Sequence, residues 1–243
     1  MTINTLNPDR NFIDAIEIAN NLNLNYLVLF GSLLGLIRDG KLIDWDKDVD
    51  LVCVFRSKKE VDEIICNFKR LGFKGGFQRR IKPTLPALKF HREGGRKIDI
   101  EFVYTFEKNC YLEWFSIFVA YDKLGKRTFI NKLFRFVSRL PFNEGLMASS
   151  PHKGNNLLLA RFSFTFAKQI SFLLKTLLVL LNKNQKLIAE IPYECISEKK
   201  FFLYHGKKCL IPKNPECFLV HHYGENWKTP KKSQKWTEYL KEK

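Results

Sequence analysis

Residues Tyr26–Phe55 read YLVLFGSLLGLIRDGKLIDWDKDVDLVCVF. The apolar run 26–30 indicates a short buried strand, and Ser32–Arg38 has the apolar spacing of a helix that begins at Gly31-Ser32. The almost continuously apolar segment 49–55 predicts a second strand. Between this helix and this strand, four acids fall within seven positions: Asp44, Asp46, Asp48 and Asp50. The chain therefore places a strand, a helix and a carboxylate cluster in direct succession.

Further elements flank this unit. Apolar spacing predicts one helix over 11–24 and another over 58–71, the second capped by Ser57. Segments 87–93 and 97–106 are joined by a Gly-Gly turn and predict a hairpin. We therefore expect an α/β fold, a mixed sheet with flanking helices.

Three carboxylates in this pattern suggest a metal site. Asp48 and Asp50 leave the same face of a strand because side chains alternate with a period of two. Asp99 lies in the apolar strand context Lys-Ile-Asp-Ile, where an acid is costly unless it is paired or bound to a metal. Oxygen ligands of this kind favour Mg²⁺ or Mn²⁺. The alternative is a solvated acidic loop that contains Asp46, Asp48 and Asp50.

The Gly31-Ser32 pair suggests a phosphate site. Gly31 permits close backbone approach, and Ser32 is expected to cap the following helix, whose first N–H groups attract anions. Arg38, two turns further along, is expected to neutralise a second phosphate oxygen.

The order of these features resembles the polymerase-β-like nucleotidyltransferase core, and one block resembles the LicD family, which includes phosphocholine transferases and fukutin-type proteins. The residues that carry this resemblance are Gly31, Ser32, Leu33, Leu34, Gly35, Arg38, Gly40, Ile43, Trp45, Asp46, Asp48, Val49 and Asp50. Two positions depart from the family pattern: Asp44 stands where Pro is common, and Lys47 stands where another acid is frequent.

A second block near the C-terminus also resembles this family. FLVHHYGENWKTP (218–230) has the expected Tyr-Gly followed by an aromatic residue and a Pro. The matching residues are Phe218, Leu219, Tyr223, Gly224, Trp227 and Pro230, preceded by Pro212 and Glu216.

The resemblance implies transfer of a phospho-alcohol group, such as phosphocholine or a polyol phosphate, from a CDP-linked donor to a sugar hydroxyl of a cell-surface glycan or glycolipid. In that reaction Asp48, Asp50 and Asp99 would hold two Mg²⁺ or Mn²⁺ ions, and Asp99 would also take the proton of the acceptor hydroxyl. Gly31, Ser32 and Arg38 would bind the nucleotide phosphate.

The resemblance leaves other roles open. Trp45 is expected either to stack on the base or sugar or to pack in the core. Asp46 is expected to orient Arg38, with a metal-ligand role as the alternative. Tyr223 and Trp227 either wall the substrate pocket or attach the C-terminal segment to the sheet.

The composition favours an anionic partner. The 243 residues carry 41 Lys and Arg against 25 Asp and Glu, a net charge of +16. Two other functions stay open: a strict nucleotidyltransferase that acts on a small molecule or RNA, and a non-catalytic basic nucleic-acid binder. The retained carboxylates argue against the second, so nucleic acid is not the expected partner.

We expect three segments: a nucleotidyltransferase-like core over 1–107, a mostly helical, Phe- and Leu-rich segment over 108–190, and a C-terminal motif with a basic tail over 191–243. Within 157–183, Arg161, Lys168, Lys175 and Asn182 form a polar stripe on one side of a helix. This helix is expected either to pack over the sheet or to touch a membrane interface peripherally.

Six Cys residues without a CxxC pair are interpreted as free thiols in a reducing compartment. Three of them, Cys195, Cys209 and Cys217, share the last third of the chain with His205, His221 and His222, but their spacing fits no standard zinc site. The N-terminus lacks the pattern of a signal peptide. We therefore expect a cytoplasmic protein, with the inner membrane face as a further location.

Overall fold

The computed structural model describes residues 8–77, 85–105, 110–115, 173, 186–231 and 241–242. They fall into two compact units. The larger unit contains the described residues of Met1–Gln78, Leu85–Leu112 and Ala189–Leu240. All the functional residues discussed below belong to this unit.

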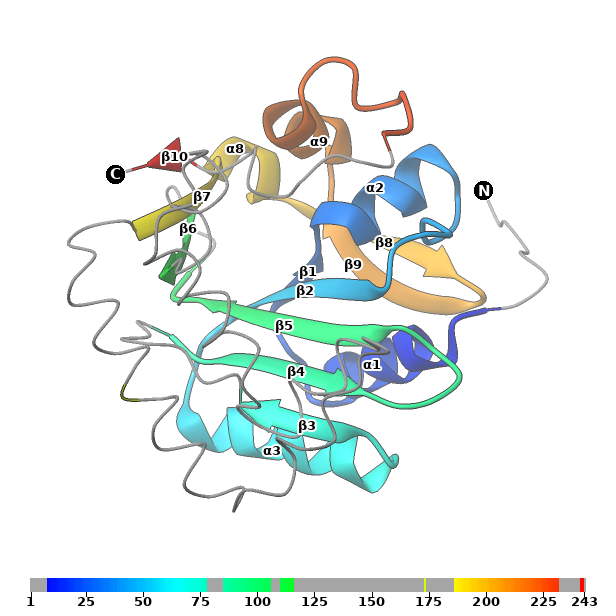
Figure 1. Cartoon of the computed structure of the whole chain (residues 1–243), viewed down its shortest axis with the longest axis vertical. Helices are drawn as coiled ribbons and strands as arrows, with labels where there is room; N and C mark the ends of the chain where they lie inside the picture. The colour runs from blue at the N-terminus through cyan, green and yellow to red at the C-terminus, as the bar shows by residue number, and fades with distance from the viewer. Residues whose placement is uncertain are drawn as a thin grey trace. The chain divides into compact units, whose positions relative to one another are not determined.

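A five-stranded mixed sheet forms the centre of the larger unit (Figure 1). Its strands, in spatial order, are β1 (Tyr26–Val28), β2 (Asp48–Val54), β5 (Lys97–Val103), β4 (Ala87–His91) and β3 (Lys74–Phe77). Only β2 and β5 pair in parallel, whereas the other neighbours in this sheet are antiparallel. The α/β fold and the hairpin of β4 and β5 are therefore confirmed.

Alternation along the strands gives this sheet an apolar face and a polar face. The apolar face is covered by α1 (Arg10–Asn21) and α3 (Lys58–Arg70), which pack against each other. The ring of Phe68 in α3 stacks on Phe90 of β4 with centroids 4.0 Å apart. The polar face carries the alternate residues of β2, β5 and β4. They are half-buried and mostly charged: Asp48, Asp50, Lys97, Asp99, Glu101, Lys89 and His91.

Two helices begin at side-chain caps, and the cap predicted at Ser57 is confirmed. The Asp9 carboxylate accepts a hydrogen bond from the Phe12 N–H at the start of α1. The Ser57 hydroxyl accepts one from the Glu60 N–H at the start of α3. These caps satisfy N–H groups that have no partner within the helix.

The start of α2 (Phe30–Arg38) differs from the prediction. Its N-cap is Leu29, with no side-chain hydrogen bond, so Ser32 lies inside the first turn and the prediction that it caps the helix is wrong. Phe30 takes a left-handed backbone conformation with φ of 52°. A bulky residue rarely adopts this conformation, which requires support from the surrounding packing.

The sequence did not predict β3, whose residues KGGF carry no strand pattern. Gly75 and Gly76 both have positive φ. A Cβ atom on Gly75 would overlap the carbonyl of Lys89, so glycine allows β3 to approach β4 closely.

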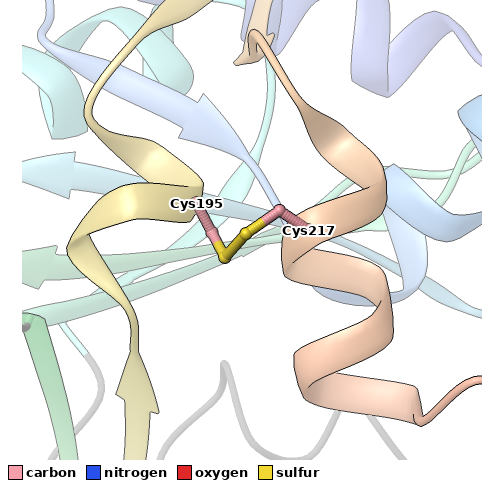
Figure 2. Close-up of a disulfide and its surroundings, with 2 residues drawn as sticks. All are labelled: Cys195 and Cys217. Carbon is pink, nitrogen blue, oxygen red and sulfur yellow. A yellow bond between two sulfur atoms is a disulfide. The ribbon is translucent and has the colours of Figure 1, made fainter.

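The C-terminal part of the larger unit contains α8 (Tyr193–Ile196), the hairpin of β8 (Lys199–Tyr204) and β9 (Lys207–Pro212), and α9 (Pro215–Tyr223). Figure 2 shows Cys195 of α8 joined to Cys217 of α9 by a disulfide, with 5.2 Å between their Cα atoms. The interpretation of these two cysteines as free thiols is therefore wrong. Because disulfides persist mainly in oxidising compartments, the expected reducing compartment loses this support.

Three further strands, β6 (Cys110–Phe115), β7 (Lys186–Ile191) and β10 (Lys241–Glu242), form a second sheet in the order β10-β7-β6. The expected helix from 167 onward and the polar stripe within 157–183 lie outside the described residues, apart from Leu173. No helix in the described ranges is both long and apolar enough to cross a membrane.

Candidate active site

The three carboxylates predicted to act together lie on adjacent strands. In the parallel pairing of β2 and β5, Asp50 is directly opposite Asp99, and Asp48 is two residues away on β2. Side chains at directly paired positions share a face of the sheet, as do residues two apart on one strand. The sequence prediction that Asp48, Asp50 and Asp99 point the same way is therefore confirmed.

Their crowding changes the acidity of this cluster. Burial, followed by the charges of Asp48 and Asp99, raises the pKa of Asp50 well above its ordinary value. Burial also raises the pKa of Asp99 to about 6, against the opposing effect of Lys89. Burial and the neighbouring Asp48 raise the pKa of Asp46 to about 7. Each shift disfavours the charged form, so the cluster requires a cation to be fully ionised.

Lys89 provides one such cation. It is directly opposite Asp99 in the antiparallel pairing of β4 and β5, and its Nζ lies 2.7 Å from Asp99 Oδ2. The charges of Asp99, Asp48 and Asp50 together raise the pKa of Lys89 against the effect of its burial. Lys89 therefore stabilises the ionised form of Asp99 by its contact with Oδ2.

The other oxygen, Asp99 Oδ1, is buried and has no hydrogen-bond partner. Hard carboxylate oxygens on two adjacent strands, one of them unpartnered, fit Mg²⁺ or Mn²⁺. In the described part of the chain, no group of three or more His, Cys, Asp or Glu side chains is arranged so that it could hold a metal ion. The oxygen chemistry of the carboxylates suits a divalent ion, but in the described arrangement Lys89 engages one of these oxygens. This finding also leaves no described zinc cluster among the C-terminal Cys and His residues.

Asp46 lies between the cluster and the start of α2. Its Oδ2 faces Gly31 so closely that a Cβ atom on Gly31 would overlap it. Its Oδ1 accepts a hydrogen bond of 2.9 Å from the Lys47 N–H. Gly31 thus accommodates Asp46, in addition to any role in phosphate binding. The described contacts of Arg38 are with Asp39, and the expected orienting role of Asp46 toward Arg38 stays a prediction.

Arg96 holds the loop that carries Asp46. Its guanidinium donates to the carbonyls of Asp46 (3.0 Å) and Ile43 (2.9 Å) and to the buried carboxylate of Asp9 (3.2 Å). Neither Arg96 nor Lys89 was predicted from the sequence. Alternation in ALKFH places Lys89 on the polar face, but only the strand pairing brings it to Asp99. Arg96 follows a turn, where no periodic signal exists.

Ser32 connects α2 to the carboxylate strand. Its buried hydroxyl accepts a 2.9 Å hydrogen bond from the Asp50 N–H. The first intrahelical bond of α2 runs from the Leu33 N–H to the Leu29 carbonyl. The N–H groups of Phe30, Gly31 and Ser32 therefore come before the first hydrogen bond within the helix, at the positive end of the helix dipole. Through Ser32, this helix start and the carboxylates belong to one local structure.

Arg38 lies at the other end of α2, where it makes a bidentate pair with Asp39 at 2.8 and 2.7 Å. This pair raises the pKa of Arg38, and the nearby Tyr223 contributes to the same shift. Tyr223 ends α9, so the two sequence blocks meet around Arg38. The expected phosphate contact of Arg38 stays a prediction.

The two candidate tryptophans differ in exposure. Trp45 is 42% exposed, so it does not pack in the core and is available for stacking. Trp227 is 6% exposed, and its backbone N–H donates to the Gly224 carbonyl just after α9. Burial favours an anchoring role for Trp227 over a pocket wall.

A ring cluster supports the strained start of α2. Phe30 contacts Phe218 and His222 of α9, with ring centroids 5.6 and 5.0 Å apart, and Phe218 stacks on His222. The C-terminal block thus packs directly against the residue that redirects the chain from β1 into α2.

The comparison with protein families agrees with this geometry. The model of the LicD/FKTN/FKRP nucleotidyltransferase domain matches residues 23–153, more than half of the chain. The chain belongs to the LicD family. The matched range contains Gly31, Ser32, Arg38 and all the carboxylates of the cluster, and it ends before the C-terminal block of this LicD protein. No curated protein matches the sequence.

Solved structures with similar folds include two of the antibiotic-resistance factor ANT(2'')-Ia and one of a cytoplasmic RNA terminal U-transferase. The first ANT(2'')-Ia structure is 17% identical, with 39% of the LicD chain and 48% of its own chain covered. The second, in complex with adenylyl-2''-tobramycin, is 16% identical with coverages of 44% and 51%. The U-transferase is 19% identical with coverages of 38% and 27%. All three have a TM-score of 0.29, and the LicD chain spans about half or less of each.

Proposed function

We propose that this LicD-family transferase moves a phospho-alcohol group, such as phosphocholine or a polyol phosphate, from a CDP-linked donor to a sugar hydroxyl of a cell-surface glycan or glycolipid. The observation that carries the proposal is the pairing of Asp50 with Asp99, beside Asp48 and next to the start of α2. This arrangement joins a divalent-ion donor set to a helix start suited to phosphate, which is what transfer of a substituted phosphate requires.

The carboxylates of Asp48, Asp50 and Asp99 would hold Mg²⁺ or Mn²⁺. When bound, such an ion stabilises the charge on the phosphoryl oxygens during an in-line displacement. Because Ser32 ties the start of α2 to Asp50, the N–H groups of its first turn are well placed to bind the donor phosphate. Trp45, on the exposed loop before β2, would stack on the donor base or the sugar.

Asp99 would take the proton of the acceptor hydroxyl. Its Oδ2 is engaged by Lys89 and its Oδ1 has no partner, so Asp99 would both hold a metal ion and accept this proton only when Lys89 releases Oδ2. A carboxyl whose pKa is raised to about 6 suits a general base near neutral pH. Arg96 would support the reaction indirectly, because it fixes the loop from Ile43 to Asp46.

The net charge of +16 supports an anionic acceptor surface and a peripheral membrane contact where the acceptor is a glycolipid. Cytoplasmic location at the inner membrane face remains part of this proposal. The state of the Cys195–Cys217 pair in cell extracts, measured by thiol labelling, bears directly on the compartment.

The test is a release assay. The purified chain is incubated with CDP-choline, CDP-ribitol, CDP-glycerol or CTP, with Mg²⁺ or with EDTA. Asp50→Asn and Asp99→Asn serve as site variants, and Asp62→Asn, an exposed acid of α3, is the matched control. We expect CMP from one CDP-alcohol, dependent on metal, retained in the control and reduced at least ~100-fold in the site variants.

Two results would contradict the proposal. Pyrophosphate released from CTP would indicate a strict nucleotidyltransferase, which the fold also permits. Salt-sensitive binding of arbitrary oligonucleotides that ignores Mg²⁺, together with no CMP release, would indicate the basic nucleic-acid binder.

A further inference from the structure

A row of basic side chains crosses the polar face of the sheet next to the carboxylate cluster. Lys74 on β3 is paired with His91 on β4. The antiparallel register of β4 and β5 pairs Phe90 with Ile98, so the next position places His91 opposite Lys97. Lys97 on β5 is in turn paired with Asp48 on β2. We call Lys74, His91 and Lys97 the basic row.

The basic row is only partly neutralised by the described residues: the charges of Asp48 and Asp99 act on Lys97, but its pKa is still lowered by burial and by the neighbouring Lys89. None of its three side chains takes part in an ion pair in the described part of the chain, and His91 Nδ1 is a buried atom with no hydrogen-bond partner. After burial, the neighbouring charges of Lys74 and Lys97 are the causes that lower the pKa of His91. Lys74 and Lys97 therefore place positive charge on either side of the His91 ring, and an anion bound there would offset it.

The row also lies on a particular side of the carboxylates. The start of α2 contacts β2 through the bond from Asp50 to Ser32, whereas the basic row extends through β5 and β4 to β3. Adjacent strands are about 4.8 Å apart, so the row reaches roughly 10–15 Å away from Asp48. The carboxylate cluster thus has the N–H groups of a helix start on one side and the side chains of the basic row on the other.

We propose that the basic row binds a phosphate group carried by the acceptor, so that the acceptor glycan is itself phosphorylated. The assignment to the acceptor rests on the proposed function: an in-line displacement brings the acceptor opposite the leaving nucleotide. With the donor phosphate at the start of α2, the acceptor approaches over β5 and β4. Lys97 and Lys74 supply charge there, and His91 Nδ1 supplies a hydrogen bond.

The test measures binding, without turnover, on the full chain. Inorganic phosphate is titrated while the imidazole NMR signal of His91, assigned by its loss in His91→Gln, is followed. The titration is repeated with CMP at saturation to fill the donor side. Variants are Lys97→Met and Lys74→Met. The matched control is Lys69→Met, an exposed cation of α3 on the covered side of the sheet.

We expect a saturable shift of the His91 signal that persists with CMP bound. Its Kd should rise about tenfold in each row variant and stay unchanged in Lys69→Met, since a charge-assisted contact is worth about one factor of ten or more. A phosphate shift that CMP abolishes would assign the row to the donor and overturn the proposal. Equal weakening in Lys69→Met, or no saturable shift, would also overturn it.

These results separate this proposal from the proposed function. Saturable phosphate binding at His91 without CMP release from any donor would uphold the anion site while the transferase assignment fails. CMP release to an unphosphorylated acceptor, with equal rates in wild type and Lys97→Met, would uphold the transferase and overturn the phosphorylated acceptor.

Discussion

Asp46 Oδ2 lies over the α-carbon of Gly31, in the space that a β-carbon at this position would occupy. The two residues belong to the same sequence block but to different elements, a helix start and the loop before β2. The contact fixes the distance between α2 and the acidic loop. It therefore gives Gly31 a structural role that does not depend on any ligand.

We predict that Gly31→Ala lowers the free energy of unfolding by about 1–3 kcal/mol, because the new methyl group overlaps Asp46. Alanine inside a helix would otherwise be favoured by up to about 1 kcal/mol. Urea unfolding of the single variants and of Gly31→Ala/Asp46→Ala measures the coupling. With Asp46 truncated, Gly31→Ala should be neutral or stabilising. An unchanged cost in that background would show that the overlap with Asp46 is not the cause.

Lys89 should stabilise the metal-free protein. Lys89→Met leaves Asp99 without its 2.7 Å partner, and breaking a largely buried pair by removing one member costs on the order of 3 kcal/mol. The measurement is urea unfolding in EDTA. Lys59→Met, which removes an exposed helix pair with Glu63, should change the free energy of unfolding by less than about 0.5 kcal/mol. A second variant, Lys89→Met/Asp99→Asn, should recover much of the loss.

Much of the core could be predicted from the sequence because it depends on local periods. The helix from Arg10, the helix from Lys58 and the hairpin at 87–103 follow from apolar spacing, caps and a Gly-Gly turn. The shared face of Asp48 and Asp50 follows from the strand period alone. Asp99 was expected near Asp48 and Asp50 because an acid in an apolar strand is costly unless it is paired or bound to a metal, and the other two carboxylates suggested a metal site.

The rest depends on contacts between distant segments. The Phe30–Phe218 ring contact joins residues far apart in the chain, and no local pattern encodes it. The Cys195–Cys217 disulfide follows no spacing rule, so six cysteines gave no pairing. The β3 segment has two glycines and no alternation, and it forms a strand only because β4 offers it an edge.

The Cys195–Cys217 disulfide should stabilise the C-terminal part of the larger unit. It closes a separation of 22 residues, for which the chain-entropy estimate is about 3 kcal/mol. Cys195→Ser/Cys217→Ser should therefore lower the unfolding free energy by that order under oxidising conditions, and dithiothreitol should lower it equally in the wild type. Cys66→Ser, an exposed free cysteine on α3, is the control and should leave the value unchanged. Equal stability of wild type and double serine variant under oxidising conditions would contradict this role.

His222 should make the free energy of unfolding depend on pH. Burial, with a smaller contribution from His221, lowers the pKa of His222 to about 4, and its ring packs against those of Phe30 and Phe218. In the unfolded chain His222 binds a proton near its ordinary pKa of about 6.5, whereas the folded protein resists this proton until about 4. The unfolded state therefore binds more protons between these values. The contribution of His222 to the free energy of unfolding is fully present above about pH 6.5, and it is lost as the pH falls to about 4.

The loss attributable to His222 is on the order of 3 kcal/mol, which unfolding measurements at pH 7, 6, 5 and 4.5 can resolve. Carboxylates contribute their own acid dependence, so the informative quantity is the difference from His222→Gln, which should lose this part of the slope. His205→Asn, at the β8–β9 turn, removes a histidine outside the ring cluster and should keep the wild-type slope. A His222→Gln profile parallel to the wild type would mean that His222 already binds its proton in the folded protein. In that case the contacts of His222 with the two phenylalanine rings would not exclude water from its ring, and burial of His222 would not contribute to the support of Phe30.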